Sequence, residues 1–261
     1  MLETSTPRVR LGTRGPEVSR LCFGLGSSGC GSHSLQSRRP PEEIAAFLLE
    51  GISEGVTWWD TSDDYGTHRH IAHALRAVDR AAVQITTKTR AGTRRGARAS
   101  LEKSLRELGT DYVDVFLMHE VDSHQDLEAR GGALEALASL REDGLAGAVG
   151  LSTHAIEVLE RVAGDPRLDV LLTNYNFAGV HMDADIRDYE RALIRAFEAG
   201  QGVAVMKTLG EGVLADRLRE ALSHNLAQPF IHAVLVGVKS RYEAAAAIAA
   251  WQGKAFEPAN S

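Results

Sequence analysis

Four residues of this chain are suited together to polarise a carbonyl group: Asp60, Tyr65, Lys88 and His119. Lys88 and Asp60 can form a buried ion pair that keeps the ammonium group charged. A phenol has an ordinary pKa of about 10, and a neighbouring cation is expected to lower the pKa of Tyr65 toward the working range of a general acid. His119 can orient a carbonyl oxygen between its ring and that phenol. The set suits a reaction in which a C=O group is polarised while a cofactor delivers hydride.

Polar or ionisable residues follow seven of eight short apolar runs in the sequence. Taken singly, each has an ordinary structural explanation, since an Asp or Ser after a strand often caps a helix and a lone His is often a core residue. A Lys and an Asp at the ends of adjacent strands favour one shared site instead. The seven residues are Asp60, Lys88, His119, Ser152, Asn174, Lys207 and, two residues beyond the last run, Lys239.

The apolar runs predict the strands that carry these side chains. Successive runs are separated by about the length of one helix and two loops. Strands that are hydrophobic throughout are typical of a parallel sheet buried on both faces. The runs cover residues 21–24, 56–59, 82–87, 113–118, 146–151, 169–173, 202–206 and 233–237.

Amphipathic helical patterns lie between the runs. One begins after Pro40 and Pro41, and another is expected to begin behind Ser100 and to end at Gly109. Eight strand–helix units predict the α/β class and a (β/α)8 TIM barrel, in which functional groups gather at the C-terminal ends of the strands. The other helical patterns cover residues 133–142, 155–163, 186–199, 213–222 and 242–250.

A doubly wound open sheet is the alternative fold, and it usually has a glycine-rich phosphate turn after its first strand. Residues 24–29 match GxGxxG by letter, but no helix opens at the third glycine, so we interpret the segment as a loop. Gly12 and Gly15 predict a short hairpin over residues 8–18 that plugs the barrel bottom. No linker or repeat divides the chain, and a single domain over residues 1–261 is expected.

The composition excludes several classes of protein. The 261 residues are 44% hydrophobic and 25% charged, a balance that excludes disordered, collagen-like and coiled-coil chains. The formal net charge of −6 argues against nucleic acid or a membrane surface as a partner. Cys22 and Cys30 cannot build a disulfide framework. With no apolar leader and no stretch of membrane length, the expected location is the cytoplasm.

Several segments are similar to the signatures of the aldo-keto reductase family, in particular its short bacterial-type members. The block Ser-Leu-Glu-Lys-Ser-Leu-Arg-Glu-Leu-Gly-Thr-Asp-Tyr at residues 100–112 is the most specific. The resemblance implies that Tyr65 donates a proton to a small-molecule aldehyde or ketone, that Lys88 and Asp60 tune Tyr65, and that His119 orients the substrate. The other matching segments are residues 18–24, 59–66, 87–88, 118–119, 150–152 and 175–176.

The same resemblance implies NADPH, or NADH in its place, bound in extended form across the barrel mouth. Ser152 matches a residue that contacts the nicotinamide amide, and Leu209 with Gly210 matches part of the pyrophosphate loop. Lys239 and Arg241 suit a ribose 2′-phosphate, which favours NADPH. The residues expected at the cofactor are Gly24, Ser152, Lys207, Leu209, Gly210, Gly237, Lys239, Ser240 and Arg241.

Four features depart from the family pattern on the cofactor side. Leu172 replaces an expected Gln, and Met206 replaces an aromatic residue that often stacks on the nicotinamide. Ala246 and Ala247 replace an acidic–Asn pair that contacts adenine, and Leu25 replaces a common Thr. Each departure could weaken cofactor binding or alter its pose.

These departures leave a second function open. Tyr65, Lys88 and His119 could serve a redox-neutral lyase or isomerase by acid–base chemistry without a hydride donor. A third reading is a catalytically idle subunit that senses the cofactor. Residues 120–132 are expected to form a long exposed loop that covers the pocket.

A metal site is not expected. His68, His70 and His73 do not share one face of a helix, so we expect them to face solvent. Asp63 and Asp64 are expected to be solvated carboxylates of a loop.

Overall fold

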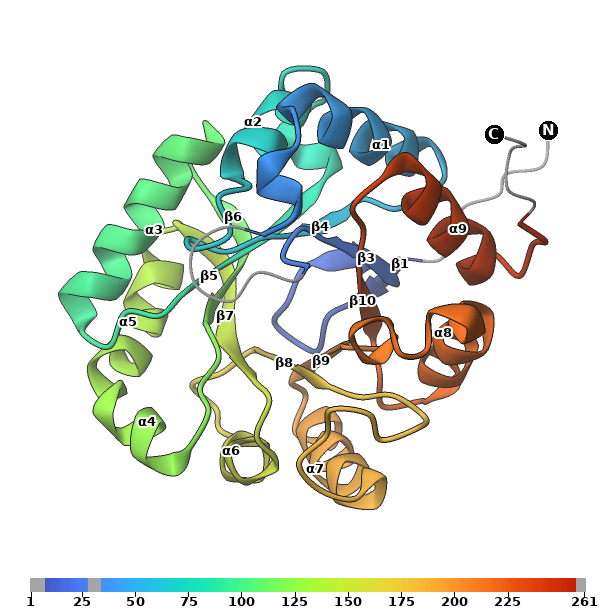
Figure 1. Cartoon of the computed structure of the whole chain (residues 1–261). Coiled ribbons are helices and arrows are strands. Elements are labelled where there is room, and N and C mark those ends of the chain that lie inside the picture. The colour runs from blue at the N-terminus through green and yellow to red at the C-terminus, as the bar shows by residue number, and fades with distance from the viewer. Residues whose placement is uncertain (1–7, 28–33, 257–261) are drawn as a thin grey trace.

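The computed structural model describes residues 8–27 and 34–256. Eight parallel strands close into a barrel in the order β10-β3-β4-β5-β6-β7-β8-β9, and helices surround it (Figure 1). The predicted (β/α)8 TIM barrel is confirmed, and the open sheet is wrong because β10 pairs with β3. The strands are β3 (Leu21–Gly24), β4 (Trp58–Asp60), β5 (Gln84–Thr89), β6 (Val113–Met118), β7 (Ala146–Thr153), β8 (Val170–Asn174), β9 (Gly202–Met206) and β10 (Ala233–Gly237).

Most of the strands are mainly hydrophobic because both sides of the barrel wall are buried. Successive side chains of a strand point to opposite sides. In β8, Leu171 packs in the core between the strands and the helices, whereas Val170 and Leu172 pack in a second cluster inside the barrel. Position along a strand therefore decides which side chains point into the barrel.

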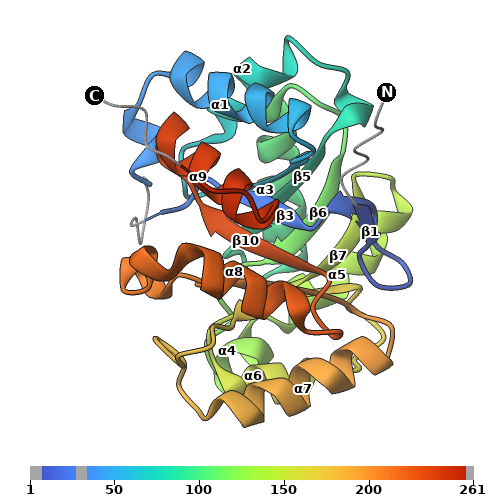
Figure 2. The ribbon, with the colours of Figure 1, turned by 90° about the vertical axis from the view of Figure 1, so that its right-hand side faces the viewer.

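The helices lie outside the strands (Figures 1 and 2). The predicted end of α3 at Gly109 is confirmed, with a φ of 70° at that glycine. Its predicted start at Ser100 is wrong, because the Thr93 side chain accepts a hydrogen bond from the amide of Gly96 and begins the helix earlier. The α-helices are α1 (Pro41–Ser53), α2 (His68–Leu75), α3 (Arg94–Leu108), α4 (His124–Ala129), α5 (Gly131–Glu142), α6 (Ile156–Val162), α7 (Ile186–Glu198), α8 (Leu218–Ala227) and α9 (Arg241–Trp251), and the 3-10 helices are η1 (Gln36–Arg38), η2 (Arg80–Ala82), η3 (Gly210–Gly212) and η4 (Ala215–Arg217).

The predicted hairpin closes the N-terminal end of the barrel. Its strands, β1 (Arg8–Arg10) and β2 (Glu17–Ser19), pair antiparallel. Leu11 is fully buried and belongs to the cluster inside the barrel. Gly12 has a φ of 68°, and a Cβ there would lie 2.3 Å from the amide nitrogen of Gly202, so this turn requires glycine.

The predicted loop over residues 120–132 is wrong, since α4 occupies its middle and Arg130 is 7% exposed.

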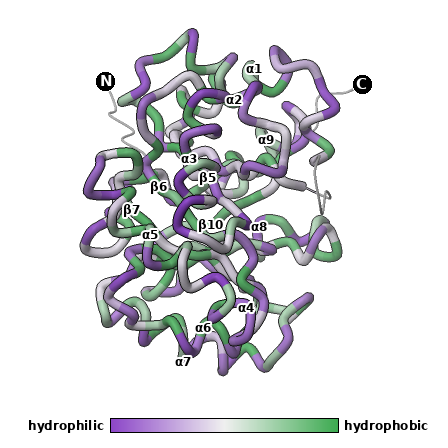
Figure 3. Tube along the Cα trace, turned by 90° about the vertical axis from the view of Figure 1, so that its left-hand side faces the viewer, coloured by the Kyte–Doolittle hydropathy of each residue, from purple (hydrophilic) through white to green (hydrophobic). Residues whose placement is uncertain are grey.

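Hydrophobic and hydrophilic positions alternate along the outer helices (Figure 3), and within the described residues no helix is long and apolar enough to span a membrane. Ser28, Gly29 and Cys30 lie outside the described residues, and Cys22 is fully buried. The single domain over residues 1–261 stays a prediction.

Candidate active site

A buried ion pair joins two neighbouring strands at the C-terminal mouth of the barrel. Asp60 is the last residue of β4, and Lys88 lies near the end of β5. Lys88 Nζ lies 2.6 Å from Asp60 Oδ1 and donates a second hydrogen bond to the carbonyl oxygen of Thr61 at 2.8 Å. The two side chains are almost fully buried. Parallel pairing of β4 with β5 therefore brings this ion pair together.

The phenol and the imidazole meet above that ion pair. His119 directly follows β6, and Tyr65 lies on the loop after β4. The Tyr65 hydroxyl lies 3.1 Å from His119 Nε2, and Lys88 Nζ lies 4.8 Å from the centre of the Tyr65 ring. Gly26, in the loop after β3, permits the close approach of the Tyr65 ring, since a Cβ at Gly26 would lie 2.2 Å from that ring. The structure thus brings all four residues of the predicted set together, and Gly26 is a contributor that the sequence reasoning missed.

The expected direction of the Tyr65 pKa shift is wrong. Burial raises the pKa of Tyr65 to about 12, because the opposite effect of the Lys88 charge is smaller than the loss of hydration. Burial lowers the pKa of Lys88, but Asp60 and Tyr65 more than offset it and raise that pKa to about 12. Lys88 therefore remains an ammonium ion and Tyr65 remains a protonated phenol at neutral pH.

Arg90 and Asp64 were also missed as neighbours of the site. Asp64 is not a solvated loop carboxylate, since its side chain is 19% exposed and accepts a hydrogen bond from Arg90 Nε at 3.0 Å. Arg90 also pairs with Glu120, which follows His119 in the chain. The signal was present in the sequence, because Arg90 stands two residues after Lys88, directly beyond the end of β5, and side chains two apart on an extended backbone share a face.

Two polar side chains lie at the C-terminal ends of β7 and β8. Ser152 is 1% exposed, and its Oγ accepts a hydrogen bond from the amide of Glu120 at 2.9 Å. Asn174 ends β8 on the same face as Leu172, so it points into the barrel. Its Oδ1 is buried and has no hydrogen-bond partner in the described part of the chain. This carbonyl oxygen is a free acceptor for an amide N–H.

The predicted pyrophosphate residues follow β9. Lys207 has a φ of 53°, and its ammonium group lies 2.7 Å from Glu211 Oε1. Leu209 precedes the 3-10 helix η3, which Gly210 begins. Gly24 and Gly237 pair at the ends of β3 and β10. These five residues line one sector of the mouth, where the resemblance expects the cofactor.

The predicted phosphate ligands at the start of α9 already have acidic partners. Glu243 accepts a hydrogen bond from the amide of Lys239 at 2.8 Å and lies 3.3 Å from its ammonium group. Ser240 caps the helix through the amide of Glu243. Arg241 donates a hydrogen bond to Glu50 at 2.8 Å. A ribose 2′-phosphate bound there would have to displace Glu243 from Lys239.

The departures from the family pattern are placed as follows. Leu172 belongs to the cluster inside the barrel, below the mouth, and Met206 packs against that cluster. Leu25 and Ala247 are buried in the outer core, and Ala246 is partly exposed on α9. The nicotinamide end fits, since Asn174 Oδ1 offers an amide acceptor beside Ser152, whereas the 2′-phosphate end fits less well because of Glu243.

The expectation that the three histidines of α2 face solvent is wrong for two of them. His68 is 3% exposed and interacts with Glu107 at 2.7 Å and Thr87 at 3.0 Å, and His70 is fully buried. His68 is covered by residues of α3 and β5, whereas His70 interacts with the carbonyl oxygen of Arg39 at 3.0 Å, so two different sides of α2 are buried. Among the described residues, no group of three or more His, Cys, Asp or Glu could hold a metal ion.

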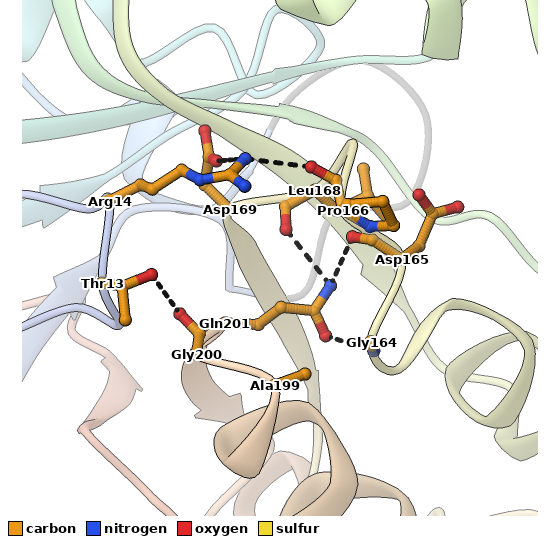
Figure 4. A pocket seen from close by; sticks show the side chains of 10 residues that line it. All are labelled: Thr13, Arg14, Gly164, Asp165, Pro166, Leu168, Asp169, Ala199, Gly200 and Gln201. Carbon is orange, nitrogen blue, oxygen red and sulfur yellow. Dashed lines mark hydrogen bonds and ion pairs between the residues drawn. The ribbon is translucent and has the colours of Figure 1, made fainter.

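A small cavity of about 80 Å³ lies at the opposite, N-terminal end of the barrel (Figure 4). Asp169 is buried there and lies 2.6 Å from Arg141 and 3.2 Å from Arg14 of the hairpin turn. Gln201 donates hydrogen bonds to three carbonyl oxygens in the same place. These contacts fasten the hairpin to the barrel base and lie away from the mouth.

Comparison with known proteins gives one consistent result. A model of the aldo/keto reductase family matches residues 20–255. A Glycine max protein named as an aldo-keto reductase is 27% identical over 227 residues, which are 81% of this chain and 62% of that protein, so the chain spans less than two thirds of that relative. A solved Pseudomonas aeruginosa structure described as an aldo-keto reductase has a TM-score of 0.80 at 24% identity, covering 95% of this chain and 96% of that one. For the holo form of an aldo-keto reductase from Bacillus halodurans, the TM-score is 0.77 at 20% identity, with 94% and 90% covered. These two likenesses concern the fold.

Proposed function

This chain belongs to the aldo-keto reductase family, and on that premise we propose that it reduces an aldehyde or ketone to an alcohol with a nicotinamide cofactor. The observation that carries the proposal is the Tyr65 hydroxyl 3.1 Å from His119 Nε2, above the buried Lys88–Asp60 pair. The proposal includes a small-molecule carbonyl compound as the partner and the cytoplasm as the location.

A carbonyl oxygen seated between Tyr65 and His119 would accept hydrogen bonds from both side chains. Bound NADPH or NADH would supply the hydride. As negative charge develops on the oxygen, the Tyr65 hydroxyl transfers its proton to it, and the ammonium group of Lys88 stabilises the phenolate that remains. Asp60 keeps Lys88 charged and in place. Asn174 and Ser152 would hold the nicotinamide amide, and Lys207 with Gly210 the pyrophosphate.

The direct test combines turnover with binding. Purified protein is offered a panel of aldehydes and ketones with NADPH or NADH, and cofactor affinity is measured by fluorescence titration. Carbonyl-dependent cofactor oxidation supports the proposal, and absence of binding by either cofactor contradicts it. Conversion of a substrate without a change in nicotinamide absorbance would instead favour the redox-neutral lyase or isomerase. Tight binding without any turnover would favour the idle, cofactor-sensing subunit.

Replacing Glu243 with Gln is expected to shift the choice of cofactor toward NADPH. The carboxylate of Glu243 accepts a hydrogen bond from the amide of Lys239 and pairs with its ammonium group. It would therefore repel a 2′-phosphate. Because this ion pair is partly exposed, the ratio of the Kd for NADH to the Kd for NADPH should rise by about 5-fold. Glu50→Gln is the control, since it frees the more exposed Arg241 and should change the ratio less. An unchanged ratio in Glu243→Gln would contradict the expectation.

A further inference from the structure

We propose that Asp64 and Glu120, tied together by Arg90, are positioning residues that hold the imidazole of His119 in its protonated form and direct its Nε2–H toward the substrate oxygen. The proposal rests on the proposed carbonyl reduction, because it assigns the state in which His119 meets the carbonyl group. Asp64, Arg90 and Glu120 do not belong to the predicted set of four residues. They lie on three different loops at the mouth.

Each ring nitrogen of His119 faces one carboxylate and one hydroxyl group. Asp64 Oδ1 lies 3.5 Å from Nδ1, where Ser62 Oγ also lies at 2.9 Å. Glu120 Oε1 lies 3.7 Å from Nε2, beside the Tyr65 hydroxyl. A ring that faces an anionic acceptor at both nitrogens is stabilised when both nitrogens carry protons.

Arg90 holds the second oxygen of each carboxylate. Its Nε donates to Asp64 Oδ2 at 3.0 Å, and its Nη2 donates to Glu120 Oε2. The first oxygens, Asp64 Oδ1 and Glu120 Oε1, are thereby turned toward His119. Asp64 Oδ1 is buried and makes no hydrogen bond of ordinary geometry within the described residues, which leaves the imidazole as its charged neighbour.

The backbone that carries His119 and Glu120 is also fixed. Glu120 has a φ of 47°, an unfavourable conformation for a residue with a side chain. Its amide donates to Ser152 Oγ, and the buried guanidinium of Arg130 donates to the carbonyl oxygens of His119 and Thr89, each at 2.9 Å. These contacts maintain the strained conformation that places the Glu120 carboxylate beside the ring.

Two carboxylates and one guanidinium group surround the ring. Burial of a ring that is 3% exposed would favour the neutral form, and the two carboxylates oppose that effect. With Arg90, the cluster carries one net negative charge when His119 is neutral and none when it is protonated. Burial raises the pKa of Asp64 and of Glu120, yet His119 and Arg90 bring each pKa below its ordinary value.

The other ionisable groups that face the ring do not reverse this balance. Lys88 is compensated by Asp60. Burial and the charge of Lys207 lower the pKa of His154 to about 4, so His154 is neutral at neutral pH. Lys207 itself is paired with Glu211. In the proposed state, His119 would be a charged hydrogen-bond donor at the carbonyl oxygen, and a charged donor polarises that oxygen more strongly than a neutral ring does.

The test is an NMR titration of histidine-labelled full-length protein without cofactor or substrate, with the His119 resonance assigned by its loss in His119→Gln. We expect Asp64→Asn and Glu120→Gln each to lower the midpoint of the His119 titration by about one pH unit, an effect typical of losing a charged neighbour. As the pH is raised, the kcat/KM of each variant should begin to fall at a correspondingly lower pH than that of the wild type. Asp63→Asn is the matched control, because the Asp63 carboxylate accepts a hydrogen bond from Ser100 at 2.6 Å and should leave the midpoint unchanged.

Midpoints that stay at the wild-type value in both variants would overturn the proposal, as would an equal shift in Asp63→Asn. If one variant fails to fold, the other gives the same decision. The titration requires no turnover. A shifted midpoint without carbonyl-dependent cofactor oxidation would therefore support the positioning role of Asp64 and Glu120 and reject the proposed function. Cofactor oxidation with unchanged midpoints would reject the positioning role alone.

Discussion

Replacing Tyr65 with Phe is expected to lower kcat/KM for carbonyl reduction by about 10²–10⁴-fold, because a phenylalanine has no proton to give to the developing alkoxide. The ring itself stays, so its packing against Gly26 and Lys88 is retained. Cofactor affinity should therefore remain close to that of the wild type. Initial rates of cofactor oxidation and fluorescence titration measure the two quantities separately.

The control for this prediction is Tyr112→Phe. The Tyr112 ring stacks under Arg80, just before β6 begins at the other end of the barrel, and its hydroxyl should not affect turnover. A Tyr65→Phe enzyme that keeps more than about a tenth of the wild-type kcat/KM would contradict the assignment of Tyr65 as proton donor.

Replacing Lys88 with Met is expected to lower the free energy of unfolding by about 3–5 kcal/mol, because it leaves the carboxylate of Asp60 buried without a counter-charge. Activity should also be lost, since the phenolate of Tyr65 would face no cation. The double variant Asp60→Asn with Lys88→Met should regain much of the stability and none of the activity. Urea unfolding curves and initial rates distinguish these outcomes.

The exposed pair Lys103–Glu107 offers the matched control for that change. Lys103 is 61% exposed and lies 3.6 Å from Glu107, so Lys103→Met should change stability by at most about 1 kcal/mol. If Lys88→Met is no less stable than this control, the buried pair does not contribute as argued.

The same pair has a definite pH dependence. The pKa of Lys88 is raised from 10.5 to about 12, so the folded state binds this proton more tightly than the unfolded state does. The stability that results is fully present below pH 10.5 and is lost as the pH rises through about 12. The free energy of unfolding of the wild type should therefore fall between pH 10.5 and about 12, and the contribution of Lys88 to this fall should be absent in Lys88→Met.

The sequence by itself determined the barrel and several of the residues at its mouth. Apolar strands such as residues 21–24 must be buried on both faces, and eight strands alternating with amphipathic helices favour closure. Strand alternation and strand ends then assign Asp60, Lys88 and His119 to one rim. These inferences depend on local patterns of hydrophobicity, which the chain carries residue by residue.

Only the tertiary structure decided which side chains compensate one another. Arg90 meets carboxylates 26 and 30 residues away, and Lys239 meets Glu243 instead of a free site for phosphate. The direction of the Tyr65 pKa shift depends on how much water its hydroxyl loses against its distance from Lys88. Such balances between burial and charge change within a few ångströms. No pattern along the chain records distances on that scale, which is why Tyr65 could be identified from the sequence but the charge state of its surroundings could not.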